Sequence, residues 1–298
     1  MMETPSLGII DAHVHVWDPA VLDYAWLADS PGLGRPFLPA HLPHGSTNTR
    51  AAVFVQADCR DDQALKEVDW VSGLRTGWPQ LAGIVAFAPI SRGDAVAEDL
   101  DQLLERPLVR GVRQLFQDRD DSFMLDSRTL AGARRVAASG LVFDACIRAG
   151  QLGALAEFAR RVPDLTIVLD HMGKPPLASG EPASWSTGVR ELAGLPNVVA
   201  KISGAGAEAD PHRPLAPQAL PFIRETLRLF GAERCMIGSD FPVSLTSPAA
   251  YQDWITIVEE AMAGASDGER AGVAHRTAAR VYQLQEEPRQ AAPNQEKD

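Results

Sequence analysis

Three histidines and one aspartate stand directly after apolar, strand-like segments of the chain. His13 and His15 form an HxH pair in IIDAHVHVWDP, His171 follows the run IVLD, and Asp240 lies in MIGSDFP. Side chains two positions apart on a strand point to the same side, so His13 and His15 can contact one metal ion or one reacting oxygen. A carboxylate beside imidazoles can serve as a general base. An HxH pair alone more often makes ordinary loop hydrogen bonds, so its meaning depends on what lies nearby.

Eight short runs rich in branched apolar residues predict the strands that must position these side chains. Most of the runs are continuously apolar in their first half, as in parallel strands covered on both faces. Amphipathic helical patterns fill the gaps between them. Eight successive βα units predict a (β/α)₈ TIM barrel forming a single α/β domain. The runs are residues 9–16, 50–57, 81–90, 109–116, 141–147, 165–171, 197–204 and 234–241.

The segments that are not part of the eight βα units predict a loop at the rim of the barrel, a C-terminal helix and a tail. Residues 17–49 are rich in Pro and Gly and follow a strand end, so we expect a long loop that forms a rim or partial lid over the active face. One helix pattern, 127–140, begins with Ser127 as its predicted N-cap and stops at Gly140. A helix over 267–284 packs against the end of a barrel that spans residues 8–285. Residues 286–298 are polar and are expected to be disordered.

Barrel closure is what brings the four candidate residues together. In a barrel of this kind, polar side chains at the C-terminal ends of the strands carry the function. The first and eighth strands become neighbours, so Asp240 must approach His13 and His15, and His171 ends the sixth strand. Three of the seven histidines of the chain therefore fall at one predicted barrel mouth beside a carboxylate, which favours a functional site.

Composition limits the partners. With 28 Lys and Arg against 39 Asp and Glu, the formal charge is −11 and no basic face for nucleic acid is evident. No apolar run approaches the roughly 20 residues needed to span a bilayer, so we expect no membrane association. Three widely separated cysteines and an N-terminus without an export signal predict a cytoplasmic protein whose partner is a small molecule. The oligomeric state is left open.

The motifs together resemble those of the amidohydrolase superfamily, and most closely its lactonase branch, which includes sugar-lactone hydrolases and 2-pyrone-4,6-dicarboxylate lactonase. The matching segments extend from about residue 8 to about residue 285, and Val16 departs from the pattern because an aromatic residue usually precedes the Trp. They are DAHVHVWDP, DYAWL, GVRQLFQD, GLVFDACIR, IVLDHMGKP, NVVAKISG and GSDFPV. The resemblance implies hydrolysis of a sugar-acid lactone, with Asp240, His13, His15 and His171 as catalytic residues.

The resemblance also bears on metal binding. Two-metal members of the superfamily bridge their ions with a carbamylated Lys or a Glu at the end of the fourth strand, and VRGVRQLF offers neither, so a binuclear centre is not expected. At most one divalent ion, zinc or manganese, is expected at His13, His15 and Asp240, with His171 as a further ligand. The same residues can also act without a metal, since several lactonases are metal-independent.

Five further residues are candidates for substrate binding. Arg113 and Gln114 end the fourth strand, and an Arg there can hold a carboxylate or a lactone oxygen, or form a salt bridge to the loop with Asp118. Arg148 either reaches substrate or contacts the start of a helix. Tyr24 and Trp26 flank the mouth, where they hold a sugar ring or cover the rim.

Three neighbours have plainer expectations. Trp17 is expected to seal the rim, Asp11 to be a structural group one pleat deeper than His13, and Lys174 to be a solvated loop charge.

The predicted reaction is hydrolysis of an aldonolactone of the fuconolactone, rhamnonolactone or galactonolactone type. Asp240 would activate water, and the three histidines would stabilise the oxyanion directly or through one ion. Two alternatives stay open. The first is a metal-dependent decarboxylase or other lyase of the same superfamily. The second is a barrel that binds sugar acids without catalysis, which would not require a base.

Overall fold

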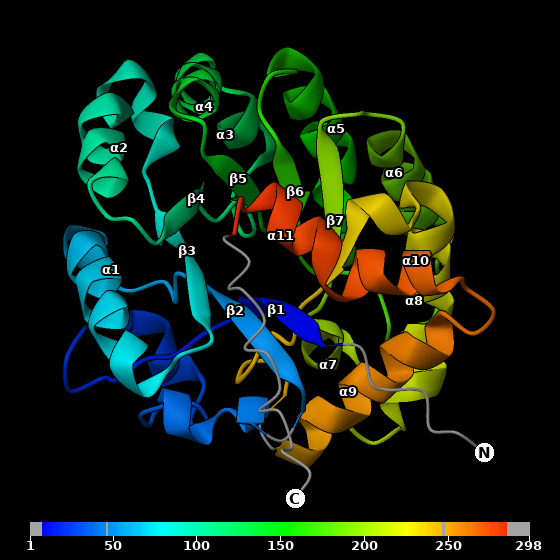
Figure 1. Cartoon of the computed structure of the whole chain (residues 1–298). Coiled ribbons are helices and arrows are strands. Elements are labelled where there is room, and N and C mark those ends of the chain that lie inside the picture. The colour runs from blue at the N-terminus through cyan, green and yellow to red at the C-terminus, as the bar shows by residue number, and fades with distance from the viewer. Residues whose placement is uncertain (1–7, 46, 246–247, 285–298) are drawn as a thin grey trace, which may run out of the picture.

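Eight parallel strands form a barrel surrounded by helices in the computed structural model of the chain (Figure 1). The structure describes residues 8–45, 47–245 and 248–284, so the predicted tail at 286–298 lies outside the described residues. Hydrogen-bonded neighbours follow the chain order from β1 to β8, which confirms the predicted TIM barrel. The strands are β1 (Ile9–Val14), β2 (Thr49–Val55), β3 (Leu81–Phe87), β4 (Val109–Arg113), β5 (Val142–Ala145), β6 (Ile167–Leu169), β7 (Val198–Ile202) and β8 (Cys235–Ile237).

The barrel closes through the loop that follows β8. Val14 and Phe241 form a parallel bridge. The amide of His15 donates to the carbonyl of Phe241 at 2.8 Å, and the amide of Asp240 donates to the carbonyl of His13 at 2.7 Å. The backbone of Asp240 is therefore bonded directly to the strand that carries both histidines.

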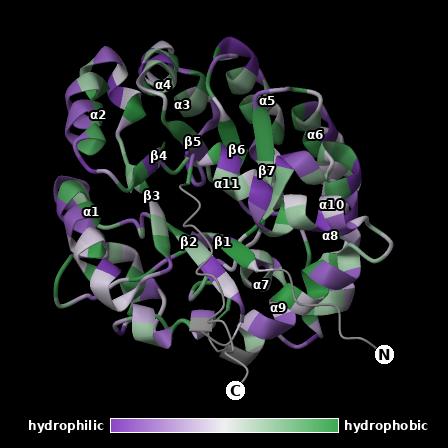
Figure 2. Ribbon diagram, in the orientation of Figure 1, coloured by the Kyte–Doolittle hydropathy of each residue, from purple (hydrophilic) through white to green (hydrophobic). Residues whose placement is uncertain are grey.

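The helices cover the outside of the barrel and turn their apolar sides toward the strands (Figure 2). One boundary differs from the sequence prediction: Asp126, not Ser127, is the N-cap of the helix 127–139, because the Asp126 carboxylate accepts from the amide of Arg128 at 2.8 Å. Gly140 ends that helix in the left-handed conformation, as predicted. The helices are α1 (Ala64–Gly73), α2 (Ala97–Leu104), α3 (Asp121–Leu125), α4 (Ser127–Ser139), α5 (Leu152–Arg161), α6 (Ala183–Ala193), α7 (Ala205–Glu208), α8 (Leu215–Phe230), α9 (Pro248–Ala261), α10 (Asp267–Ala271) and α11 (Thr277–Val281).

The interior of the barrel changes from apolar to charged along the strands. Side chains alternate across a strand, and on two strands an inward valine is followed two residues later by a charged side chain: Asp144 follows Val142 on β5, and Lys201 follows Val199 on β7. The helix α11 lies across one end of the barrel (Figure 1), where Tyr282 joins the valines and donates its hydroxyl to Asp144 at 2.9 Å. A buried charged layer thus lies between an apolar floor and the barrel mouth.

The long loop after β1 docks onto the rim of the mouth. It contains short 3₁₀ turns rather than a long helix. The indole of Trp17 is fully buried and donates to the carbonyl of Arg35 at 3.0 Å. The indole of Trp26 donates to the carbonyl of Ala57, after β2, at 2.8 Å. These hydrogen bonds fix the fold of the loop and attach it to the segment after β2, so the loop forms the expected rim on this side of the mouth.

A buried acid supports this rim and makes stability depend on pH. Glu67 on α1 accepts from the amide of Ala57 at 3.1 Å, and burial raises the pKa of its carboxyl from 4.5 to about 7. Because the folded-state pKa is the higher one, folded protein binds more protons between pH 4.5 and 7. We expect the stability contribution of Glu67 to be greatest at pH 4.5 and to fall by up to about 3 kcal/mol as pH rises to 7, while the lowered pKa of His171 contributes a change of opposite sign between pH 4 and 6.5.

Denaturant titrations at several pH values check this prediction. Glu67→Gln, which carries no titrating carboxyl, should make the slope of stability against pH between 4.5 and 7 more positive than in the wild type. Glu98→Gln, an exposed position on α2, is the matched control and should keep the wild-type slope. An unchanged slope in Glu67→Gln would contradict the assignment.

Among the described residues, no helix combines the length and apolarity required to cross a bilayer.

Candidate active site

Two histidines and the aspartate converge at the barrel mouth. Nε2 of His13 lies 3.2 Å from Nε2 of His15, and the Asp240 Oδ1 atom lies 3.6 Å and 3.3 Å from these two nitrogens. Nε2 of His171 lies 4.0 Å from the same carboxylate oxygen. All four side chains are buried. The structure thus brings together the four residues on which the sequence prediction depended.

Strained backbone turns aim two of these side chains. Asp240 has a φ of +57° and His171 a φ of +54°, a left-handed conformation that costs a non-glycine residue about 1 kcal/mol or more. The hydroxyl of Ser244 donates to Asp240 Oδ2 at 2.6 Å, and Nδ1 of His171 lies 2.9 Å from the hydroxyl of Ser203. Asp240 and His171 are therefore each held in orientation by a serine hydroxyl on the side away from the cluster.

Asp11 ties the loop that carries Asp240 to β1. Its carboxylate accepts from the amide of Ser239 at 2.8 Å, from the Ser239 hydroxyl at 2.6 Å and from the Tyr251 hydroxyl at 2.9 Å. Asp11 is buried, so these bonds are shielded from water. It has the structural position expected from the sequence.

Burial sets the protonation states of the cluster. Burial lowers the pKa of His171 to about 4, although nearby carboxylates oppose it. Burial, and then a neighbouring ammonium group, holds the pKa of His13 well below its usual value. Burial would raise the pKa of Asp240, but the surrounding rings of His171, His15 and His13 outweigh it and lower that pKa. At pH 7 the site therefore combines an ionised carboxylate with neutral His13 and His171 rings.

The donor set fits one divalent cation. His15 Nδ1 lies 2.7 Å from the carbonyl of Val55, which can only accept, so Nδ1 carries a proton and the neutral ring offers the lone pair of Nε2 to a cation. Nδ1 of His13 lies 3.2 Å from Asp170 Oδ1, which can accept a hydrogen bond from it in the same way and leave Nε2 of His13 for a cation. The two Nε2 atoms and Asp240 Oδ1 are 3.2 to 3.6 Å apart. Ligand atoms of a tetrahedral zinc are about 3.3 Å apart, given bonds of about 2.0 to 2.1 Å.

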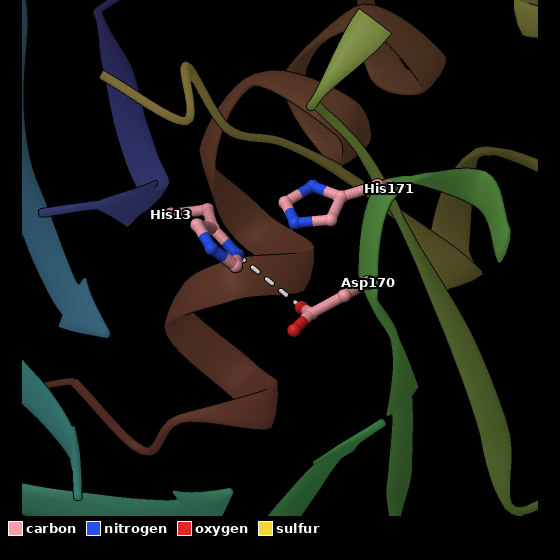
Figure 3. Close-up of side chains that lie close together, drawn as sticks. All are labelled: His13, Asp170 and His171. Carbon is pink, nitrogen blue, oxygen red and sulfur yellow. Dashed lines mark ion pairs between the residues drawn. The ribbon is translucent and has the colours of Figure 1, made fainter. Parts of the chain in front are cut away.

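A second cluster lies below the first and was missed by sequence reasoning. Nζ of Lys201 donates to Asp144, lies 3.1 Å from Asp170 Oδ1 and lies 3.2 Å from Nδ1 of His13. Arg113 donates to the other Asp170 oxygen at 3.3 Å. Figure 3 shows Asp170 and His171 side by side after β6, facing His13. The available signal was a lone charge inside an apolar strand, as in VVAKI and LVFDA.

The first cluster, with His15, His171 and Asp240, lines a pocket of about 540 Å³. Of the predicted binding residues, Trp26, Arg113 and Gln114 line this pocket. The Gln114 amide exchanges two hydrogen bonds with Ser91. Nε of Arg113 is buried and has no hydrogen-bond partner among the described residues. Arg113 thus lines the pocket, while its Nε atom is buried behind the pocket wall.

The other two predicted binding residues lie elsewhere. Tyr24 is buried behind the rim in the apolar core, near Glu67. Arg148 is about half exposed and forms an ion pair with Asp118 at 2.6 Å.

Lys174 differs from its expected solvated position. It lines the pocket, is only 18% exposed and donates to the side-chain oxygen of Gln117 at 2.6 Å.

Gly204, which follows β7, leaves room for His171. It has a φ of +70°, and a Cβ atom there would lie 2.5 Å from Cγ and 2.8 Å from Cβ of His171. We expect Gly204→Ala to displace the imidazole and lower kcat as well as stability. Gly180→Ala is the matched control, because Gly180 has the same φ with nothing within 4 Å. It should lose about 1 kcal/mol of stability and keep its activity; equal activity in the two variants would contradict the packing argument.

The fold and the site define a hydrolase-type barrel with a histidine–carboxylate centre, and comparisons with known proteins agree. The amidohydrolase family model matches residues 10–284. An L-fucono-1,5-lactonase of Burkholderia ambifaria is 37% identical over 84% of this chain and 87% of that protein. An L-fucono-1,5-lactonase of Burkholderia multivorans is 34% identical over 93% of this chain and 96% of its own length.

A crystal structure agrees as well. An amidohydrolase from Burkholderia multivorans with bound zinc superimposes with a TM-score of 0.83 at 32% identity, covering 94% of this chain and 100% of that one. The chain belongs to the amidohydrolase family.

Proposed function

We propose that this chain is a lactonase that opens the lactone of a sugar acid, with Asp240 as general base. The observation that carries the proposal is the ionised Asp240 carboxylate held among three imidazoles at a 540 Å³ pocket. The identity of 37% and 34% with two L-fucono-1,5-lactonases supports an aldonolactone as the substrate.

In this mechanism Asp240 takes a proton from a water molecule while the water oxygen bonds to the lactone carbonyl carbon. Negative charge develops on the carbonyl oxygen, where a ring N–H group of the histidines, or one divalent cation held by them, would stabilise it. The bond between the carbonyl carbon and the ring oxygen then breaks, and Asp240 returns its proton to that oxygen. Ser244 donates a hydrogen bond to Oδ2 of Asp240 throughout, so the orientation of Oδ1, the basic oxygen, stays fixed.

The lowered pKa of Asp240 also limits its basicity. A carboxylate that stays ionised so readily is a weak base, so acidification of the attacking water where it binds would assist proton transfer. A divalent cation held by His13, His15 and Asp240 would supply Lewis acidity for this purpose and would polarise the carbonyl. We propose zinc or manganese as that cation, present in the enzyme but not obligatory.

Arg113 and Trp26 are proposed to position the substrate. The guanidinium group of Arg113, which lines the pocket, can donate to a hydroxyl or lactone oxygen. Trp26 offers an aromatic wall on the opposite loop and is held in place by its bond to Ala57. Tyr24 and Arg148 do not line the pocket and have no direct role in substrate binding in this proposal.

A pH-indicator assay over five- and six-membered aldonolactones, with and without chelator, tests the function. We expect acid release above the spontaneous rate with at least one lactone, L-fucono-1,5-lactone being the first choice. Carbon dioxide release, with complete loss on chelation, would indicate a decarboxylase. Saturable binding of lactones without consumption would indicate a binding barrel.

A further inference from the structure

Four consecutive residues after β6 form a left-handed turn that carries Lys174 to the barrel mouth. The φ angles of His171, Met172, Gly173 and Lys174 are +54°, +54°, +71° and +51°. The amide of Lys174 donates to the carbonyl of His171 at 2.9 Å, which closes the turn. Three of these four residues are not glycine, so the turn is strained. Strain of this kind is typical of functional positions, and the mechanism above uses only His171 of the turn.

Lys174 meets two side chains from other loops in the pocket wall. Its ammonium group donates to Oε1 of Gln117, a residue after β4, at 2.6 Å. Its Nζ atom lies 3.8 Å from Oε1 of Glu208, the last residue of α7. All three side chains line the pocket. The side chains of Lys174 and Glu208 are only 18% and 26% exposed, so what binds in the pocket, rather than bulk water, is their natural partner.

These contacts leave hydrogen-bonding groups without a protein partner. An ammonium group has three donors, and Lys174 uses one of them on Gln117. Because an ammonium group cannot accept, the oxygen of the Gln117 amide must face it, and both donors of the amide nitrogen stay free. The 3.8 Å separation from Glu208 is too long for a hydrogen bond. In the part of the chain that the structure describes, no other group donates to the Glu208 carboxylate.

We propose that Gln117, Lys174 and Glu208 bind the hydroxyl groups of the substrate, and we call these three residues the hydroxyl subsite. A hydroxyl group both donates and accepts, and the subsite places ammonium and amide donors beside a carboxylate acceptor. One positive and one negative charge balance within it, which suits a neutral ligand. This inference rests on the proposed lactonase function and narrows the substrate to a lactone ring that carries several hydroxyl groups.

The hydroxyl subsite makes the enzyme selective against lactones without hydroxyl groups. The turn that carries Lys174 also carries His171, so the subsite lies beside the reacting centre. The methylene groups of an unsubstituted ring would displace water from the three polar side chains without replacing its hydrogen bonds. A site built to hydrogen-bond a substrate hydroxyl rejects an analogue that lacks it for this reason. The three residues bind substrate in this scheme and take no part in making or breaking bonds.

Turnover of two six-membered lactones tests the inference. L-fucono-1,5-lactone carries ring hydroxyl groups, and δ-valerolactone carries none. Lys174→Met removes the donors and keeps an unbranched side chain. The ratio of kcat/KM for the first lactone to kcat/KM for the second should fall about tenfold or more, because hydrogen bonds from a charged group are lost. Lys66→Met, at an exposed position on α1, is the matched control and should keep the wild-type ratio. A purely structural defect lowers both values equally, so an unchanged ratio in Lys174→Met would overturn the proposal.

Glu208→Gln provides a second variant. It keeps the shape of the side chain and removes the charged acceptor, so the same ratio should fall about fivefold. If Lys174→Met does not fold, this ratio decides, and an unchanged value contradicts the hydroxyl subsite. Glu98→Gln, exposed on α2, is its matched control.

A binding measurement separates this inference from the proposed function. The compound 1,5-anhydro-L-fucitol has the ring and hydroxyl groups of the fuconolactone but no carbonyl, so calorimetric titration with it needs no turnover. Wild-type protein should bind it about tenfold more tightly than Lys174→Met or more. If either lactone is not opened by the wild type, this titration replaces the ratio, and failure on both lactones counts against the proposed function. Equal binding by the two proteins, or no binding by the wild type, would refute the hydroxyl subsite.

Discussion

Asp240→Asn is expected to lower kcat for lactone hydrolysis by about 10²- to 10⁴-fold, the usual contribution of a general base. The amide cannot take the proton of the attacking water, although it can still accept the bond from Ser244. KM should change much less, because the pocket wall with Arg113 and Trp26 is untouched. Steady-state kinetics on the best lactone, with metal content measured in the same samples, give both values.

Asp118→Asn is the matched control. Asp118 also lines the pocket, but its carboxylate is largely exposed and pairs with Arg148 rather than with the histidines. This variant should keep near-wild-type turnover. The assignment of Asp240 as the base fails if Asp240→Asn does the same.

Lys201→Met is expected to cost about 3 to 5 kcal/mol of folding stability, the typical penalty for removing one partner of a buried ion pair. Lys201, Asp144 and Asp170 are all fully buried, so the two carboxylates would lose their shared counter-ion without gaining water. Urea unfolding measures the loss. Adding Asp144→Asn should recover part of it, because one uncompensated charge disappears.

Lys66→Met serves as the control for this loss. Lys66 lies on the exposed side of α1, and its removal should leave the unfolding midpoint almost unchanged. Equal midpoints for Lys66→Met and Lys201→Met would show that the buried cluster contributes nothing to stability.

Much of the fold could be predicted because the local patterns are unambiguous. Apolar runs such as the one over 81–90 can only be buried strands, and their alternation with amphipathic segments leaves a barrel as the natural arrangement. Boundaries were less predictable. The sixth strand ends at Leu169 rather than at His171, because His171 and Met172 both adopt positive φ, and neither is a glycine that would mark the turn. Asp126 and Ser127 are both good N-caps, and only their geometry separates them.

The site was predictable to the extent that its residues stand at strand ends. His13, His15 and Asp240 could be brought together from sequence because closure of the barrel makes β1 and β8 neighbours. The buried charged layer below them, with Lys201, Asp144 and Asp170, could not be predicted from the sequence. Lys201 and Asp144 are 57 residues apart, and each is one charge inside an apolar strand. Their pairing depends on which inward positions share a level across strands, which requires the registers of the whole barrel.

The helix α11 gives the buried charges a particular place in the order of folding. Every strand leaves the ribosome before Tyr282, whose hydroxyl binds both oxygens of Asp144 at 2.9 and 3.0 Å. The contact between Tyr282 and Asp144 can therefore form during synthesis only after all eight strands have been made. A fragment that stops before Thr277 would contain all eight strands and lack the hydroxyl that binds Asp144.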